Sequence, residues 1–307
     1  MAKAQSSADA ENPDTAALMP RRSQFTLDQS RDFFAKLQKS LPADVLKCST
    51  GMQIGEQAKY VTWTIPTTPK YRTVELSQIT DVQFGHIACK YERVIEYRDW
   101  ILSEPNRFML WTGDNVDAWA MWSPGRAFDQ LGDPQSQVMK FVEVWGPARH
   151  RVLGYVGGNH ERRALPGFGD LGTLIAMLLG IPYSNGRQLI DIRYGQHNPF
   201  QISLWHGVGG ARTKGTVAQI LDRFMSRGDS QVYLMGHLHQ PMIIPGWREV
   251  REPGQNRIGV RKCFGAVGSS FLSTWGTYGE IAGYSSHDVL MPRIVLEPNG
   301  KYEVTLK

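Results

Sequence analysis

The segment RFMLWTGDNVD, residues 107–117, runs from a short series of apolar residues into a glycine and two carboxylates. A short apolar run bounded by turn residues is typical of a buried strand, so we predict a strand over 107–112 that ends at Gly113 and Asp114. Four further segments have the same form, in that each predicted strand ends at a polar residue: TVELSQITD (73–81), RVLGYVGGNHE (151–161), QISLWH (201–206) and QVYLMGHLH (231–239).

Helical patterns lie between these predicted strands, at 91–103, 136–145 and 216–226. Strands that alternate with helices predict an α/β fold with parallel strands. Ligands of such sheets bind at the carboxyl ends of the strands. We therefore expect the polar residues at the five strand ends to meet in one site.

The remaining segments suggest how the chain is organised. Residues 1–23 are polar and predict a disordered tail. Residues 24–70, with an amphipathic helix at 26–41 and a strand at 60–65, predict an N-terminal extension, and 71–307 the main domain. From 242 onward the sequence predicts strands, and Asn299-Gly300 predicts the turn of a final hairpin.

Composition excludes several classes of protein. No run approaches the roughly 18 apolar residues that a membrane helix needs, and the N-terminus lacks the features of a secretory signal or a transit peptide, so we expect no membrane partner and a cytoplasmic location. Three cysteines (Cys48, Cys89, Cys263) without CxxC spacing argue against a disulfide framework and predict buried thiols. The net charge of +5 is compatible with an anionic substrate.

Together the strand ends give five ordered blocks: Asp81-x-Gln83, Gly113-Asp114-x-x-Asp117, Gly158-Asn159-His160-Glu161, His206-Gly207 and Gly236-His237-x-His239. Their order and chemistry resemble the calcineurin-like metallophosphoesterase superfamily, whose pattern is DxH, GDxxD, GNH(E/D), H and GHxH. The resemblance covers roughly half of the chain, and only the first block departs from it. It implies a four-layer α/β/β/α sandwich of two mixed sheets flanked by helices, and a phosphoester hydrolase with a dinuclear metal centre.

The resemblance also implies the metal ligands. The first metal would be held by Asp81, Gln83, Asp114 and His239, and the second by Asp114, Asn159, His206 and His237. Oxygen and imidazole ligands suit Mn²⁺, with Fe, Zn²⁺ or Ni²⁺ as alternatives. Asp114 would bridge the two metals, and the water between them would be the nucleophile. The glycines Gly113, Gly158 and Gly236 would permit the tight turns that bring the ligands together.

Gln83 stands where the family has histidine, and three interpretations remain open. Its amide oxygen could bind the metal, its amide could hydrogen-bond a metal-bound water, or His86 could replace it. Each of them makes occupancy of the first site less secure than that of the second, so activity could require added Mn²⁺.

By the same resemblance, His160 would contact the substrate phosphate or leaving group as general acid or transition-state stabiliser. Asp117 would orient that imidazole. Arg162 and Arg163 follow the third block, and Arg212 and Lys214 follow the fourth. These four cations could bind phosphate oxygens or could be solvated loop charges.

Other residues near the blocks have two interpretations. Four aromatic residues near Asp114 are expected to be buried in the core: Trp111, Trp119, Trp122 and Phe128. If any of them are exposed, they could stack on nucleic-acid bases, and Trp119 and Trp122 are the two most expected to be exposed. His150 and His197 are expected to be structural or surface residues. His287 keeps some chance of a role in the site.

Three functions follow. The first is a phosphodiesterase acting on nucleic acid, DNA or RNA, since the last block looks like that of the DNA exonuclease branch and the second lacks the Arg-Gly of the protein phosphatases. The second is a phosphatase or diesterase of small molecules such as nucleotides. The third is a degenerate member that binds metal or nucleic acid without turnover, which Gln83 favours and the retained His160 and Asp117 disfavour. A nuclease should have a basic groove beside the metals, and a small-molecule enzyme a closed pocket.

Overall fold

The computed structural model of the chain describes residues 58–123, 125–195, 199–251, 257–275, 277, 280, 283 and 285–307. The predicted tail (1–23), the predicted helix at 26–41, Cys48 and His197 lie outside the described residues. Within them, no helix combines the length and the apolar character needed to cross a membrane.

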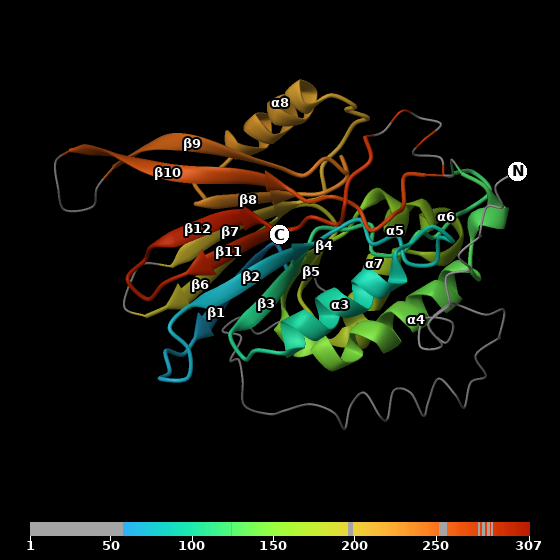
Figure 1. The fold of residues 1–307 in the computed structure, drawn as a ribbon, viewed down its shortest axis with the longest axis horizontal. Coiled ribbons are helices and arrows are strands. Elements are labelled where there is room, and N and C mark those ends of the chain that lie inside the picture. The colour runs from blue at the N-terminus through green and yellow to red at the C-terminus, as the bar shows by residue number, and fades with distance from the viewer. Residues whose placement is uncertain are drawn as a thin grey trace, which may run out of the picture.

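Two six-stranded sheets form the centre of the molecule (Figure 1). The first has the order β1 (Tyr60–Ile65), β6 (Gln188–Tyr194), β7 (Phe200–Trp205), β8 (Val232–Met235), β10 (Ile258–Val267) and β9 (Met242–Arg251). The second has the order β12 (Tyr302–Leu306), β11 (Pro292–Leu296), β2 (Val74–Ile79), β3 (Arg107–Trp111), β4 (Val152–Val156) and β5 (Tyr183–Ser184). Both sheets are mixed: β2 to β5 are parallel but β11 is antiparallel to β2, and β7, β8 and β10 are parallel but β9 is antiparallel to β10.

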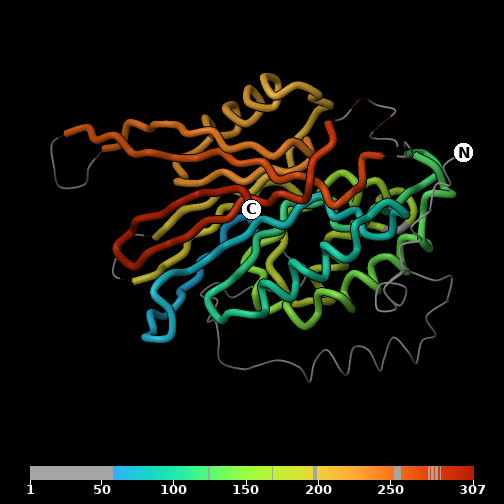
Figure 2. The backbone as a smooth tube through the Cα atoms, viewed as in Figure 1, coloured from blue at the N-terminus to red at the C-terminus, as the bar shows by residue number. Residues whose placement is uncertain are grey.

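Helices cover the outer face of each sheet (Figure 1). The second sheet carries α3 (Tyr91–Leu102), α4 (Pro134–Trp145) and α7 (Leu171–Leu179), and the first carries α8 (Lys214–Met225). Shorter elements are η1 (Ala127–Asp129), η2 (Gly146–Arg151), α5 (Asn159–Arg163) and α6 (Leu165–Phe168). In the tube view of Figure 2, the β9–β10 ribbon extends beyond the neighbouring strands at one end.

The strands send alternate residues to opposite faces, as their period of two requires. On β3, Phe108 and Leu110 enter the core between the sheets, while Met109 and Trp111 pack under the helices. On β8, Leu234 faces the core between the sheets and Tyr233 packs against α8. Three apolar cores thus separate four layers, and the predicted α/β/β/α sandwich is confirmed.

Most predicted elements are confirmed, with ends shifted by one or two residues. The predicted helices correspond to α3, α4 and α8, and the predicted final hairpin to β11 and β12, whose turn contains Gly300 with φ +83°. The predicted strand at 60–65 is β1, an edge strand of the first sheet, so the last part of the expected extension belongs to that sheet. β5 and β6 were not predicted. Cys89 and Cys263 are free and buried, as expected.

Candidate active site

The five candidate blocks lie at the carboxyl ends of β2, β3, β4, β7 and β8, where backbone hydrogen bonds join the loops. The Asp81 amide donates to the Gly113 carbonyl (2.9 Å), and the Gly236 amide donates to the His206 carbonyl (3.1 Å). The His237 amide donates to the carboxylate of Asp81 (2.9 Å), which links the first sheet to the second. Residues 156 positions apart in the chain therefore share one site.

The backbone at this site has unusual torsion angles. Among the residues that the structure describes, six non-glycine residues have positive φ, and all belong to this site or its border: Asp81, Gln83, Asp114, Ala118, His237 and His239, with φ from 46° to 69°. This region is sparsely populated by residues with a side chain and costs of order 1 kcal/mol each. These torsion angles lower the stability of the fold, and they direct the side chains to a common point.

Close approach explains two of the predicted glycines. A Cβ on Gly158 would lie 2.0 Å from Oδ1 of Asp114, and one on Gly236 would lie 2.1 Å from Oγ1 of Thr80. Neither position has room for a side chain. The predicted reason, a tight turn, fits Gly113, whose φ is +91°, whereas Gly158 and Gly236 do not have a positive φ and are required by lack of space.

Asp81 and His239 form one half of the candidate metal centre. Asp81 is fully buried, and its Oδ1 lies 3.0 Å from Nε2 of His239. Its Oδ2 accepts hydrogen bonds from the hydroxyl of Thr80 (2.5 Å) and the amide of His237. Burial raises the pKa of Asp81, but the neighbouring imidazoles of His239 and His206 lower it more, and the net direction is down. The carboxyl is therefore held in its ionised form.

Asp114, His206 and His237 form the other half. Each presents one possible ligand atom, and these three atoms lie within 4.8 Å of one another. Nε2 of His206 is 3.2 Å from Oδ2 of Asp114 and 3.0 Å from Oδ1 of Asn159, while its Nδ1 lies 2.7 Å from the carbonyl of Thr112. The carbonyl fixes the ring so that Nε2 faces the site.

The electrostatics of this cluster fit a bound cation. Burial lowers the pKa of His206, but the nearby carboxylates, Asp114 foremost, raise it by more than burial lowers it. The net effect is a pKa of about 9. Burial raises the pKa of Asp114, but His160 and His206 hold it well below its usual range. A buried excess of carboxylate charge that draws protons onto imidazole would equally attract a divalent cation, and the imidazole and oxygen donors suit one.

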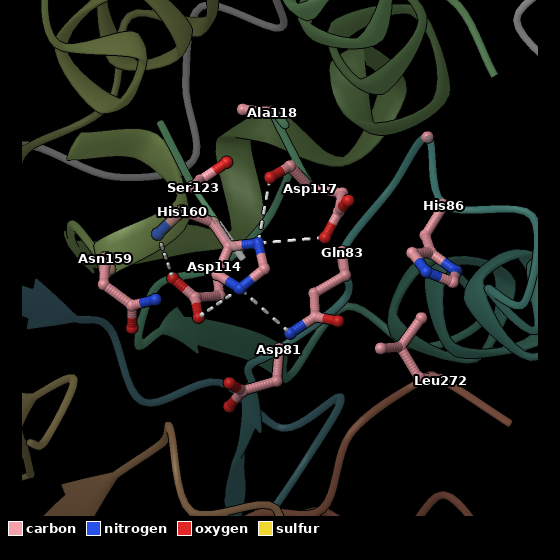
Figure 3. A network of polar contacts seen from close by, with 12 residues as sticks. Asp81, Gln83, His86, Asp114, Asp117, Ala118, Ser123, Asn159, His160 and Leu272 are labelled. Carbon is pink, nitrogen blue, oxygen red and sulfur yellow. Dashed lines mark hydrogen bonds and ion pairs between the residues drawn. The ribbon is translucent and has the colours of Figure 1, made fainter. Parts of the chain in front are cut away.

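Gln83 lies beside this cluster, almost fully buried, with its Nε2 3.5 Å from Nε2 of His160. His86 lies farther along the loop, and its Nδ1 accepts a hydrogen bond from the amide of Ala88 (3.0 Å) (Figure 3). Gln83 is thus the nearer of the two to the other candidate ligands, and its role stays a prediction.

His160 is held by Asp117, as the resemblance implied (Figure 3). Nδ1 of His160 lies 2.9 Å from Oδ1 of Asp117 and 2.9 Å from its carbonyl oxygen, while Nε2 lies 3.6 Å from Oδ2 of Asp114. Asp117 in turn accepts a hydrogen bond from Nε2 of Gln130 (2.5 Å). Burial lowers the pKa of His160, but Asp114 and Asp117 raise it more, so the ring tends to hold a second proton.

Glu161 has a role that sequence reasoning missed. Its side chain is fully buried and accepts hydrogen bonds from three backbone amides and a phenol: Asp114 (3.0 Å), Asn115 (2.7 Å), Gly158 (3.0 Å) and the hydroxyl of Tyr155 (3.0 Å). It therefore fastens the second block to the third. The glutamate that ends the GNHE block was the only sign of this role in the sequence. The sequence does not show which groups its carboxylate contacts.

A pocket of about 310 Å³ opens over the candidate metal centre. Its wall includes Gln83, Asp114, Asn159, His160, His237 and His239, together with polar residues that were not predicted, notably Arg126, Gln130, Ser270 and Thr277. His86 and His287 also line it. The position of His287 in the pocket wall is consistent with a role in the site, which stays a prediction. His150 does not line this pocket.

Of the four candidate phosphate-binding cations, Arg163 lines the pocket. Arg162 instead donates to the carbonyls of Gly158 (3.0 Å) and Asn185 (3.2 Å), because successive residues of a helix point about 100° apart. Arg212 and Lys214 are exposed and do not line the pocket. Phosphate binding stays a prediction for all four, and only Arg163 lies in the wall of the pocket.

The aromatic residues near Asp114 divide into core and surface. Trp111 is buried and packs edge-on against Phe141, Trp145 and Tyr155, as expected. Trp122 is half exposed, in agreement with the alternative kept open for it. The expectation that Phe128 is core was wrong, because its side chain is 94% exposed on η1.

A scan with family models finds no match to the chain, and a search of curated proteins finds none either. Solved structures with a similar fold include the calcineurin-like phosphoesterase YfkN from Bacillus subtilis (10% identity, TM-score 0.40, 76% of this chain and 90% of that one). Others are a protein serine/threonine phosphatase from Saccharomyces cerevisiae with similarity to human PP5 (12%, 0.35, 81% and 84%) and the Pseudomonas putida nuclease MPE (10%, 0.30, 75% and 87%). At these identities and TM-scores the similarities carry no argument about this chain, so its function has to rest on the residues of the site.

Proposed function

We propose that this protein is a metal-dependent phosphoesterase of the calcineurin-like kind that hydrolyses phosphodiester bonds, with nucleic acid as its substrate. The observation that carries the proposal is the His160–Asp117 pair, held at 2.9 Å in the wall of a pocket whose floor offers carboxylate and imidazole ligands. A protein that only bound metal would have no use for an oriented imidazole beside the ligands. The cytoplasmic location remains a prediction.

Two divalent ions would complete the site, Mn²⁺ being the first candidate and Fe, Zn²⁺ and Ni²⁺ the alternatives. One would be held by Asp81, Gln83, Asp114 and His239, and the other by Asp114, Asn159, His206 and His237. When bound, such ions supply Lewis acidity and lower the pKa of water towards 7.

The chain's own residues perform the remaining tasks. The carboxylate of Asp117 accepts a hydrogen bond from Nδ1–H of His160 and thereby leaves Nε2 directed at the pocket. From Nε2, His160 can donate a proton to the leaving oxygen of the ester, or a hydrogen bond to a phosphate oxygen as charge develops. Arg163, in the same wall, adds a positive charge to the binding of the phosphate.

A second candidate function is the hydrolysis of small phosphate esters such as nucleotides. The volume of the pocket, about 310 Å³, favours it, because this is the lower end of the range for small-molecule sites. The cations on the pocket wall, Arg126 and Arg163, favour the polyanionic substrate instead.

The experiment compares hydrolysis of bis-p-nitrophenyl phosphate and p-nitrophenyl phosphate with Mn²⁺ added. We expect a preference for the diester, and a kcat lower by about 10²- to 10⁴-fold in His160→Ala. His150→Ala, a histidine outside the pocket, serves as control and should retain activity. Preference for the monoester would select the second candidate, and the absence of any Mn²⁺-dependent rate on either ester would contradict the proposal.

A further inference from the structure

The short segment 126–130 forms one side of the pocket mouth. Arg126 and Gln130 line the pocket, and Phe128 lies between them with its ring almost wholly exposed. The segment is fixed in place, because the amide of Ile87 donates to the carbonyl of Asp129 (2.9 Å) and a β-bridge joins His86 to Gln130. An almost wholly exposed phenylalanine, on an anchored segment between two residues that line a polar pocket, needs an explanation, since burial of such a ring is strongly favourable.

A second aromatic residue lies beside the other cation of the pocket. The indole N–H of Trp122 donates to the carbonyl of Arg163 (2.7 Å), and its ring is 51% exposed. Arg163 lies close enough to His160 for its charge to lower the pKa of that imidazole. Each of the two arginines that line the pocket thus has an exposed aromatic residue near it: Phe128 follows Arg126 by two positions, and Trp122 is bonded to the backbone of Arg163.

Among the residues that the structure describes, the two guanidinium groups have no carboxylate partner. Within the described part of the chain, neither Arg126 nor Arg163 forms an ion pair or a side-chain hydrogen bond. By contrast, Arg107 and Arg293 both pair with Glu75 on the second sheet. Unpaired cations at the entrance to a phosphoester pocket are suited to anionic groups of the substrate that lie outside the pocket.

The candidate metal ligands lie deep, since Asp81, Asp114 and His206 are at most 1% exposed. A scissile phosphate must therefore enter the pocket, while the groups next to it stay at the mouth. We infer that Arg126 and Phe128, with Trp122 and Arg163, form a subsite for the nucleotides that flank the scissile phosphate of a single-stranded nucleic acid. The aromatic rings stack on flanking bases and the guanidinium groups bind flanking phosphates.

Two features favour a single strand over a duplex. An exposed ring stacks only on the face of a base that is not already stacked in a helix. A pocket of about 310 Å³ accepts roughly one nucleotide, so a paired strand would have to open before its phosphate reached the floor. The inference rests on the proposed function, which it deepens.

The test compares Phe128→Ala and Arg126→Ala with the unmodified protein on three substrates: bis-p-nitrophenyl phosphate, a short single-stranded oligodeoxynucleotide and the same sequence in a blunt duplex. Phe128 is not a candidate metal ligand or proton donor and does not line the pocket, so in Phe128→Ala the rate on the small diester should stay within about twofold. We expect kcat/KM on the single strand to fall about tenfold or more in Phe128→Ala, since one stacked base contributes roughly 1–3 kcal/mol. In Arg126→Ala, the slope of log(kcat/KM) against log[salt] should become shallower by about 0.7.

Two exposed residues away from the pocket supply matched controls: Trp247→Ala on the β9–β10 ribbon and Arg223→Ala on α8 should leave all rates unchanged. The indole of Trp122 is not a suitable site for substitution, because its loss would also move Arg163.

The outcomes separate the inference from the proposed function. Fluorescence anisotropy of a labelled oligonucleotide measures binding without turnover. If the protein binds it in a Phe128-dependent way but hydrolyses neither it nor the small diester, the subsite stands and the proposed function fails. If the small diester is hydrolysed but Phe128→Ala changes neither cleavage nor binding of the oligonucleotide, or if the duplex is cleaved as fast as the single strand, the inference is overturned. An equal loss on the small diester in Phe128→Ala would also overturn it, because that loss would be structural.

Discussion

Nδ1 of His160 lies 2.9 Å from both the carboxylate and the backbone carbonyl of Asp117, a residue 43 positions earlier in the chain. Two acceptors on one residue fix the orientation of the imidazole and keep a proton on Nδ1. The residue that would transfer a proton is thereby positioned before any substrate arrives.

This relationship predicts the pH behaviour of Asp117→Asn. The carboxylate of Asp117 is one of the groups that raise the pKa of His160 against the effect of burial. A raised pKa keeps the ring protonated to higher pH, so loss of the carboxylate should move the falling, alkaline limb of the kcat/KM profile to lower pH. We expect kcat near neutral pH to fall about 10- to 100-fold.

The measurement is a pH–rate profile on bis-p-nitrophenyl phosphate with Mn²⁺. The control is Asp222→Asn, an exposed carboxylate on α8 outside the pocket, whose profile should match that of the unmodified protein. An alkaline limb that stays where it was in Asp117→Asn would show that His160 does not act as the acid.

Gln83→His restores the residue that the family pattern has in the first block. Imidazole is a stronger metal ligand than a neutral amide, so we expect the Mn²⁺ concentration for half-maximal activity to fall roughly tenfold, the effect of about 1.4 kcal/mol in binding free energy. The positive φ of residue 83 is tolerated by histidine better than by most residues.

Two further variants distinguish the interpretations of Gln83. Bound Mn²⁺ is counted after gel filtration. If Gln83 is a ligand, Gln83→Ala should lose metal relative to the unmodified protein and His86→Ala should not. The reverse result would assign the ligand role to His86, and retention of metal in both would leave Gln83 a hydrogen-bond partner of bound water.

Metal binding should stabilise the fold measurably. At 100 times its Kd, a metal that binds only the folded state adds about 2.7 kcal/mol per site, a rise in Tm of roughly 5 °C or more. Added Mn²⁺ should give such a rise, and a chelator should reverse it. In His206→Ala the rise should shrink, because that imidazole lies against Asp114 and Asn159.

Differential scanning fluorimetry with and without Mn²⁺ checks this, with His150→Ala as the control that should keep the full rise. The comparison is between each variant with and without metal, so a lower starting Tm in His206→Ala does not affect it. A rise in His206→Ala equal to that of the unmodified protein would remove His206 from the ligand set.

Glu161→Gln tests the carboxylate that joins the second and third blocks. An amide keeps the shape but turns an NH₂ group towards backbone N–H donors, so at least one buried donor loses its acceptor. We expect the free energy of unfolding to fall by about 1–3 kcal/mol, since a buried backbone donor is left without an acceptor. Urea denaturation measures this.

The matched control is Glu143→Gln on the surface of α4, where the carboxylate pairs with Lys140 in an exposed position. It should change the free energy of unfolding by less than about 0.5 kcal/mol. A similar small change in Glu161→Gln would mean that the loops hold their positions without this side chain.

Local patterns in the sequence predicted the α/β class and the meeting of the candidate ligands at one edge, whereas the four layers were implied by the family resemblance. Apolar runs of strand length ended at polar residues, and parallel strands bring such ends together. β6, with the sequence QLIDIRY, also alternates between apolar and polar residues, but it does not end at a candidate ligand and was not predicted.

Other features depend on contacts that no local pattern contains. Glu161 reaches amides some 46 residues earlier in the chain. Arg162 and Arg163 were equally good candidates for phosphate binding in the sequence. The helical turn of α5 directs only one of them, Arg163, to the pocket. Phe128 was expected to be core because large apolar residues usually are, and its exposure follows from the anchoring of η1 at the pocket mouth.

The left-handed torsions of the candidate ligands have a consequence for anyone who selects this protein for thermostability. Glycine at position 81, 114 or 239 would relieve an unfavourable backbone angle and remove a candidate metal ligand in the same step. A library screened only for resistance to heat in the absence of metal should therefore enrich inactive variants at these positions. Engineering of this scaffold has to screen for heat resistance and turnover together, since at this edge of the two sheets the two properties make opposite demands on the same residues.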